Sequence, residues 1–127
     1  MVKLMNSAVF DTNILIDYLK GRPEAQATIE SYGSKPSISV VTWMEVMVGA
    51  KHHALEQQTR HFLSQFDVLQ IDSSVSEKAV EARRQYGIKL PDAIILATTQ
   101  VNSKTLVTRN TKDFQNVPGV IVPYSLS

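Results

Sequence analysis

Residues 9–17 read VFDTNILID, a short apolar run that passes straight into a helical pattern. Ala8–Phe10 has the character of a buried strand. The three residues that follow, 11–13, are an aspartate, a threonine and an asparagine, which favour turns and helix N-caps. Apolar side chains then recur at helical spacing over 14–19, until a glycine and a proline stop the pattern. The stretch therefore predicts a strand and a helix with Asp11 at their junction.

The rest of the chain keeps this alternation of strands and helices. Further strands are expected at 37–41, 68–71, 106–108 and 120–122, and further helices at 24–32, after a cap at Thr42, and at 54–66, 73–86 and 92–100. In the helix over 54–66, Leu55 and Phe62 are among the residues expected to face inward. Such alternation predicts an α/β fold with three α/β/α layers around a central, mostly parallel sheet of about five strands.

Length and composition limit the classes of protein to consider. With 127 residues, 43% of them hydrophobic, the chain has the size of one domain with one ordinary core, so we expect a single domain over 1–127. No stretch approaches the roughly 20 consecutive apolar residues of a membrane span. The first ten residues are too short and polar for a signal peptide, and Met5 is an alternative to Met1 as the native start. The absence of cysteine excludes disulfides and thiolate zinc sites, and it fits a cytoplasmic protein.

Four carboxylates stand in four separate contexts: Asp11, Glu45, Asp92 and Asp113. In a parallel sheet the carboxyl ends of the strands lie at one edge, which is where ligands bind. Asp11 directly follows the first expected strand, and Asp113 follows the fourth by five residues. Glu45 and Asp92 are expected in the first turns of helices that begin near this edge. Topology thus predicts that four acids distant in sequence meet at one place.

Clustered carboxylates repel one another unless a cation or a proton neutralises them. Oxygen ligands suit hard cations such as Mg²⁺ and Mn²⁺, which lower the pKa of a bound water and neutralise charge that develops on a phosphodiester. Such a site needs no histidine, cysteine or serine nucleophile. His52, His53 and His61 lack the spacing of a zinc site and are expected to be solvated. The four acids therefore predict a divalent-metal site.

Each acid also has a purely structural explanation. Asp11 could cap a helix, which is worth about 1 kcal/mol. Asp92 could oppose a helix dipole, and Asp113 could belong to a turn. Glu45 is harder to explain in this way, because it stands among apolar neighbours where an unpaired carboxylate is costly. Its structural alternative is a capping box with Thr42, three residues earlier.

The charge balance changes when the four acids are set aside. The chain has 13 Lys and Arg residues against 12 Asp and Glu, a formal net charge of +1. Without the four candidate ligands, eight acids remain and the balance becomes +5. The basic side chains then available for a polyanion, with ordinary solubilising roles as the alternative, are Arg22, Arg83, Arg84, Lys89, Lys104, Arg109 and Lys112.

The acids lie in four segments, VFDTNILID, MEVMVGA, LPDAIILATT and LVTRNTKDF, whose order and spacing resemble those of PIN-domain proteins. From Val9 to about Val122 the chain looks like a VapC-type toxin of a bacterial or archaeal toxin–antitoxin pair. The resemblance implies a PIN-like domain that cleaves RNA with Mg²⁺ or Mn²⁺ and is held inactive by a cognate antitoxin protein. It also implies a homodimer or a larger toxin–antitoxin complex. The catalytic and metal-binding residues that it implies are Asp11, Glu45, Asp92 and Asp113.

The same resemblance implies supporting residues around the acids. Those expected to orient the carboxylates or metal-bound waters, with capping and turn formation as the alternative, are Thr12, Asn13, Thr108 and Asn110. Those expected to bind substrate are Lys89, Arg109 and Lys112. In many PIN nucleases the residue matching Asn110 is an acid. The neutral Asn110 therefore favours Asp113 as the fourth acid and leaves open whether the site holds one metal ion or two.

Three hypotheses follow for the function. The leading one is a metal-dependent endoribonuclease that hydrolyses RNA with metal-activated water. The alternative is a catalytically weak PIN-like module that binds RNA or an antitoxin, using any apolar residues of the helices over 14–19 and 92–100 that are not in the core. A receiver-like signalling domain is disfavoured, because the first strand ends in a single acid and Asp72, after the strand at 68–71, lacks a comparable setting.

Overall fold

The computed structural model describes residues 7–33 and 36–126, so both candidate start residues, Met1 and Met5, lie outside the described residues. Its strands form one sheet in the order β3-β2-β1-β4-β5, in which every pairing is parallel. The strands are β1 (Ala8–Phe10), β2 (Ser37–Ser39), β3 (Asp67–Leu69), β4 (Thr105–Val107) and β5 (Val120–Ile121). The α/β fold with a central parallel sheet of five strands is thereby confirmed.

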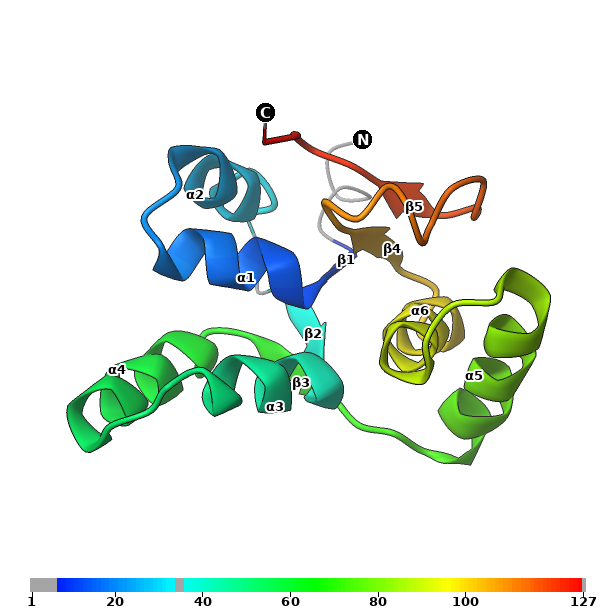
Figure 1. Cartoon of the computed structure of the whole chain (residues 1–127), viewed down its shortest axis with the longest axis horizontal. Coiled ribbons are helices and arrows are strands. Elements are labelled where there is room, and N and C mark those ends of the chain that lie inside the picture. The colour runs from blue at the N-terminus through cyan, green and yellow to red at the C-terminus, as the bar shows by residue number, and fades with distance from the viewer. Residues whose placement is uncertain (1–6, 34–35, 127) are drawn as a thin grey trace.

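Helices cover both faces of this sheet (Figure 1). In the described part of the chain they are α1 (Thr12–Leu19), α2 (Pro23–Glu30), α3 (Val40–Val48), α4 (His53–Leu63), α5 (Ser73–Tyr86) and α6 (Leu90–Val101). Val9 and Leu106 pack into one core with α5 and α6, and Phe10 and Val107 pack into a second core with α1 and α4. The chain thus has the predicted three layers. None of these helices is both long and apolar enough to cross a membrane.

The start of α3 differs from the sequence expectation, and the difference moves a candidate site residue. The strand expected over 37–41 ends at Ser39, whose hydroxyl accepts a hydrogen bond from the backbone N–H of Val41 at 3.0 Å and so caps α3. Thr42 is therefore not the cap but a fully buried residue of the first turn. Glu45 follows one turn later than expected, in the second turn of α3.

Other boundaries shift by a few residues, and one predicted core residue is wrong. β3 ends two residues earlier than expected, and α1 begins two residues earlier, at Thr12. In α4, Phe62 is buried as predicted, but Leu55 is 37% exposed. The predicted end of α5 is confirmed, because Gly87 adopts the left-handed conformation (φ +69°) that favours glycine after a helix.

Candidate active site

Asp11 joins the sheet to α1 and is almost fully buried, with 3% of its surface exposed. Its backbone N–H donates to the carbonyl of Val107 at 2.9 Å, which extends the β1–β4 pairing by one residue. Its Oδ1 accepts from the N–H of Thr12 at 2.8 Å, so Asp11 is indeed the N-cap of α1. Its Oδ2 accepts from the Thr108 hydroxyl at 2.7 Å and from the Asn13 amide at 3.4 Å. Capping therefore uses one oxygen, while the other is held by two predicted supporting residues.

The electrostatics of Asp11 are unfavourable for its charged form. Burial raises the pKa of Asp11 to about 6, even though the hydrogen bonds from Thr108 and Thr12 act to lower it. The negative charges of Asp92 and Glu45 raise this pKa further. A helix cap at the surface carries no such cost, so the capping role alone does not account for this environment.

Glu45 lies on α3 and is exposed, so its carboxylate reaches water although apolar side chains lie beside it. The Thr12 hydroxyl donates to its Oε1 at 2.6 Å. Thr12 Oγ1 also lies 3.0 Å from Thr42 Oγ1. Because a hydroxyl has a single proton, the Thr42 hydroxyl is the donor in that second contact. Since Thr42 does not cap α3, a capping box does not explain Glu45. The hydrogen bond from Thr12 instead directs the Glu45 carboxylate toward the junction at Asp11.

Asp92 occupies the first turn of α6 and is half-buried. Pro91 stands at the second position of this helix, one residue later than expected, where its missing N–H costs nothing. Burial is the largest cause that raises the pKa of Asp92, and the charges of Asp113 and Glu45 raise it as well. The nearby Lys89 ammonium acts in the opposite direction.

Asp113 follows β4 in a loop whose geometry is set by Asn110. The Asn110 side-chain amide donates to Asp113 Oδ2 at 2.9 Å, and the Asp113 backbone N–H donates to Asn110 Oδ1 at 3.0 Å. The backbone N–H of Asn110 in turn donates to Thr108 Oγ1 at 3.0 Å. The neutral residue at position 110 thus orients the acid at position 113, and Thr108 links both to Asp11.

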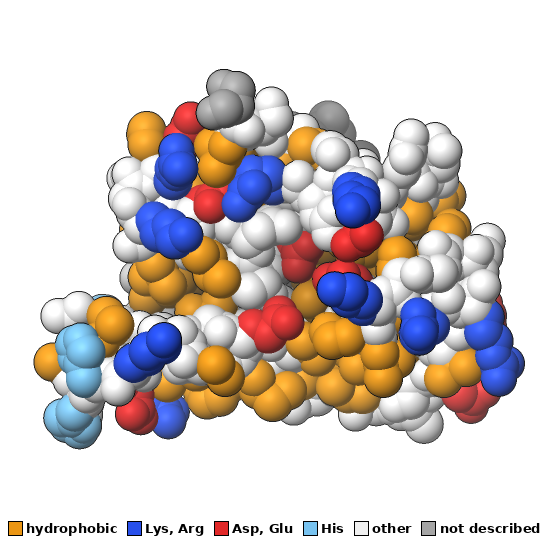
Figure 2. Space-filling model, in the orientation of Figure 1, with side chains coloured by type: hydrophobic (Ala, Val, Ile, Leu, Met, Phe, Trp, Pro, Cys, Tyr) orange, Lys and Arg blue, Asp and Glu red, His pale blue; other side chains and the backbone are white. Residues whose placement is uncertain are grey.

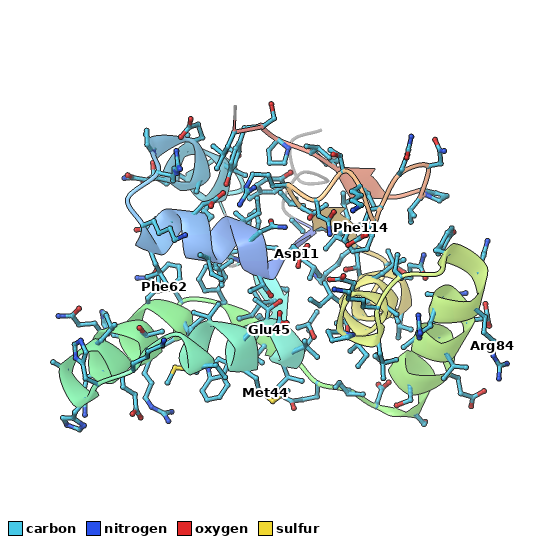
Figure 3. All side chains as sticks on the ribbon, viewed as in Figure 1. Asp11, Met44, Glu45, Phe62, Arg84 and Phe114 are labelled. Atoms are coloured by element: carbon cyan, nitrogen blue, oxygen red, sulfur yellow. The ribbon has the colours of Figure 1, made fainter. Side chains whose placement is uncertain are left out.

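The four acids therefore influence one another although they come from four elements. The charges of Asp92 and Glu45 raise the pKa of Asp11, and the charges of Asp113 and Glu45 raise the pKa of Asp92. Figure 2 shows acidic side chains gathered in the middle of one face, with Lys and Arg side chains around them. In Figure 3, Asp11 and Glu45 lie in the central region of the same face, whereas Arg84 lies on the outer side of α5. The expected combination of an acidic centre and basic surroundings is present.

The chemistry of this donor set fits a hard divalent cation. Among the described residues, none of the four acids forms an ion pair with a basic side chain. Within the same ranges, no three His, Cys, Asp or Glu side chains converge closely enough to form a metal site by themselves. Mg²⁺ usually takes only one or two carboxylates and completes its shell with water and phosphate oxygens, so a loose group of acids suits it.

Two residues that were not among the predicted site residues, Asp17 and Tyr124, lie close to this centre. Asp17 is buried on α1 and forms a two-bond ion pair with the guanidinium of Arg109, at 2.7 and 3.1 Å. The Tyr124 hydroxyl donates to Asp17 Oδ2 at 2.8 Å. Arg109, predicted to bind substrate, thus has an intramolecular partner. The only local signal for Asp17 is an acid at an inward position of the expected first helix.

Comparisons with known proteins agree on the family. The family model described as PIN domain matches residues 8–120. Ribonuclease VapC1 of Methanocaldococcus jannaschii is 30% identical over 112 residues, covering 84% of this chain and 78% of that protein. The tRNA(fMet)-specific endonuclease VapC of Shigella flexneri is 28% identical over 94% of this chain and 96% of its own.

A solved structure is similar to this chain at higher identity. A chain of a toxin–antitoxin complex from Klebsiella pneumoniae is 52% identical, with a TM-score of 0.91, and the match covers 94% of this chain and 100% of that chain. The chain described here therefore belongs to the PIN-domain family, and the two named relatives are nucleases of the VapC type.

Proposed function

We propose that this protein is the endoribonuclease toxin of a type II toxin–antitoxin pair, and that it hydrolyses RNA phosphodiesters with Mg²⁺ or Mn²⁺. The observation that carries the proposal is the group of four acids, whose charges and burial raise the pKa values of Asp11 and Asp92. Among the described residues, none of the four acids is paired with a basic side chain. The VapC relatives support the same activity. RNA as the substrate and a cognate antitoxin as the partner are consistent with a cytoplasmic site of action.

In this proposal Asp11 and Asp92 are the principal ligands of the cation, with Glu45 and Asp113 completing the site directly or through water. The cation supplies Lewis-acid chemistry, by acidifying water and neutralising charge on the phosphodiester. The chain's own residues fix the ligands beforehand. Thr108 and Asn13 hold Oδ2 of Asp11, and the Thr12 hydroxyl holds Glu45. Because the pKa of Asp11 is about 6, its carboxylate is mostly ionised at neutral pH and available as a ligand.

The substrate side of the site is basic. Lys89 precedes α6 and is near enough to Asp92 for its charge to lower the pKa of that acid. Lys112 is exposed and lines a shallow polar pocket with Asn13, next to Asp113 in the chain. We therefore propose that Lys89 and Lys112 contact RNA phosphates on either side of the acids.

The antitoxin is proposed to occupy a groove of about 400 Å³ between α1, α3 and α4. Ile16, Leu19, Val46 and Leu55 line it, and Glu45 lies at its border. Most of the apolar residues of α1 are core, as expected, but Leu19 is 45% exposed. An apolar antitoxin segment can cover this surface, and a basic side chain on it would meet Glu45 and the other acids. Relatedness to a toxin–antitoxin complex supports this partner.

The groove proposal is tested with a charged substitution. Leu19→Glu should weaken binding of the antitoxin encoded beside the toxin gene, while RNA cleavage by the free toxin stays at the wild-type rate. Val101→Glu, at a comparably exposed apolar residue at the end of α6, is the matched control and should bind normally. Equal antitoxin affinity of Leu19→Glu and wild type would place the antitoxin elsewhere.

We also propose that the protein forms the predicted homodimer. Met44 and Leu90, which are 46% and 49% exposed, line an apolar surface with Val41 and Ile94 beside Glu45. A second copy covering this surface would remove it from water. Sedimentation of the wild type should then give a dimer and that of Met44→Glu a monomer, and a wild-type monomer at micromolar concentration would contradict the dimer.

Cleavage of RNA by the purified toxin tests the proposed activity itself. Wild type should cut total RNA at discrete positions in Mn²⁺ or Mg²⁺ and lose this activity in EDTA. Asp92→Asn should be inactive with an unchanged circular dichroism spectrum. The matched control is Asp67→Asn, an exposed aspartate on β3, which should remain fully active. Cleavage by Asp92→Asn at the wild-type rate, or full activity in EDTA, would refute the proposal.

A further inference from the structure

We propose that Asp17 is a positioning residue of the nuclease centre, which acts by clamping Arg109 and Tyr124 and so fixes the loop that carries Thr108, Asn110 and Asp113. The proposal rests on the proposed function, because it assigns a role within that same site. It concerns residues outside the acidic group and gives Arg109 a role other than direct contact with RNA.

The clamp joins three segments that are distant in sequence. Both oxygens of Asp17 are used: Oδ2 accepts from Arg109 Nε at 2.7 Å and from the Tyr124 hydroxyl at 2.8 Å, and Oδ1 accepts from Arg109 Nη2 at 3.1 Å. Asp17 belongs to α1, Arg109 follows β4, and Tyr124 follows β5. The carboxylate is only 3% exposed, so it is committed to these two partners.

Arg109 lies between the two residues that hold the acids. Its neighbour Thr108 donates to Asp11 Oδ2, and its other neighbour Asn110 donates to Asp113 Oδ2. The backbone N–H of Arg109 also donates to Asn13 Oδ1 at 3.1 Å. Arg109 is therefore connected to Asp11 by hydrogen bonds through Asn13, and to Asp113 through its chain neighbour Asn110.

The chemistry of the clamp favours positioning over substrate binding. A planar guanidinium that makes two parallel bonds to one carboxylate is fixed in direction as well as in place, which a lysine ammonium cannot reproduce. The charge of Arg109 is compensated by Asp17, so it adds less to the attraction of a polyanion than Lys112, for which no ion pair is present among the described residues. Burial and the bond to Asp17 raise the pKa of Tyr124, so this hydroxyl stays a donor at every physiological pH.

The test compares kcat and KM for RNA cleavage in three variants, Asp17→Asn, Arg109→Lys and Tyr124→Phe, with Mn²⁺ present. Small displacements of catalytic groups lower rates by up to about 100-fold. We therefore expect kcat to fall about tenfold or more in the first two variants and less in the third. KM and its dependence on salt should stay within about twofold of wild type. Tyr86→Phe, a half-buried tyrosine of α5 whose hydroxyl has no hydrogen bond among the described residues, is the matched control and should leave kcat unchanged.

Hydrogen exchange supplies a readout that does not depend on cleavage. The backbone N–H groups of Asn110 and Asp113 should exchange faster in Asp17→Asn and Tyr124→Phe than in wild type, but not in Tyr86→Phe. If Asp17→Asn does not fold, Tyr124→Phe carries the test alone, because it removes one hydroxyl and leaves the ion pair intact.

Two results would overturn the proposal. In one, Arg109→Lys raises KM and lowers its salt dependence while Tyr124→Phe changes nothing, which would make Arg109 a direct RNA contact. In the other, the variants lose thermal stability but keep the wild-type kcat and the wild-type exchange of Asn110 and Asp113, which would make the clamp purely structural. If wild type itself cleaves no RNA, the proposed function fails, and unaltered exchange in the variants would separately reject the clamp.

Discussion

Replacing Asp11 by asparagine should abolish RNA cleavage and yet stabilise the metal-free protein at neutral pH. Asp11 is 3% exposed, and burial raises its pKa to about 6 from an ordinary value of 3.8. The folded state therefore binds the proton more tightly than the unfolded state does. The stability that this proton contributes is present below about pH 4 and is lost as the pH rises through about 6.

The magnitude follows from the size of the pKa shift. A shift of about two units corresponds to roughly 3 kcal/mol at 1.36 kcal/mol per unit, which the wild type loses across this pH range. Asparagine avoids this cost and keeps the bond from the Thr12 N–H. Its amide nitrogen then stands where Oδ2 was and cannot accept from the Thr108 hydroxyl or the Asn13 amide, which costs about 2 kcal/mol at roughly 1 kcal/mol per hydrogen bond. The expected net gain in the free energy of unfolding at pH 7.5 is about 1 kcal/mol.

Urea unfolding in EDTA at pH 4 and pH 7.5 measures this gain. Asp11→Asn should be less stable than wild type at the lower pH and more stable at the higher one. Asp72→Asn is the matched control, because Asp72 is the exposed N-cap of α5 and asparagine caps a helix about as well as aspartate. It should show no such crossover. An Asp11→Asn variant that is equally destabilised at both pH values would refute the reasoning from burial.

Three further predictions address the metal, the cap of α3 and the substrate. Mn²⁺ should raise the midpoint of thermal unfolding more at pH 7.5 than at pH 5, because protons compete for Asp11 and Asp92 at the lower pH; an equal rise at both would place the ion elsewhere. Ser39→Ala should lower the free energy of unfolding in urea by about 1 kcal/mol, and no loss would show that the cap is not at Ser39. Lys112→Ala should raise KM for RNA and reduce its salt slope by about 1, and an unchanged slope would remove Lys112 from the RNA path.

The order of elements was predictable because the main signals are local. A short apolar run ending in Asp11 predicts β1 and the cap of α1, and Gly87 predicts the end of α5. The start of α3 was mispredicted because Val40 and Val41 are β-branched and suit a strand as well as a helix. Ser39 decides between the two by capping the helix, and this places Glu45 in the second turn of α3, where it is exposed.

That the four acids lie near enough to influence one another was predictable because topology places the ends of parallel strands together. Their supporting contacts were less so. That Asn110 orients Asp113 follows from a turn of four residues and has a local signal in the Asn-Thr-Lys-Asp segment. The partners of Asp17 lie 92 and 107 residues away in the chain, and no local pattern links them. Only the packing of α1 against the segments after β4 and β5 reveals that pair of contacts.

The central claim is that the four acids bind the divalent cation used to cleave RNA. Binding of Mn²⁺, followed by electron paramagnetic resonance at pH 7.5, tests it without any assumption about the RNA target. Wild type and Asp72→Asn should bind Mn²⁺ with equal affinity, and Asp92→Asn should bind at least about tenfold more weakly, equivalent to about 1.4 kcal/mol. Wild-type Mn²⁺ affinity in Asp92→Asn, or no Mn²⁺ binding by the wild type at millimolar concentration, would contradict it.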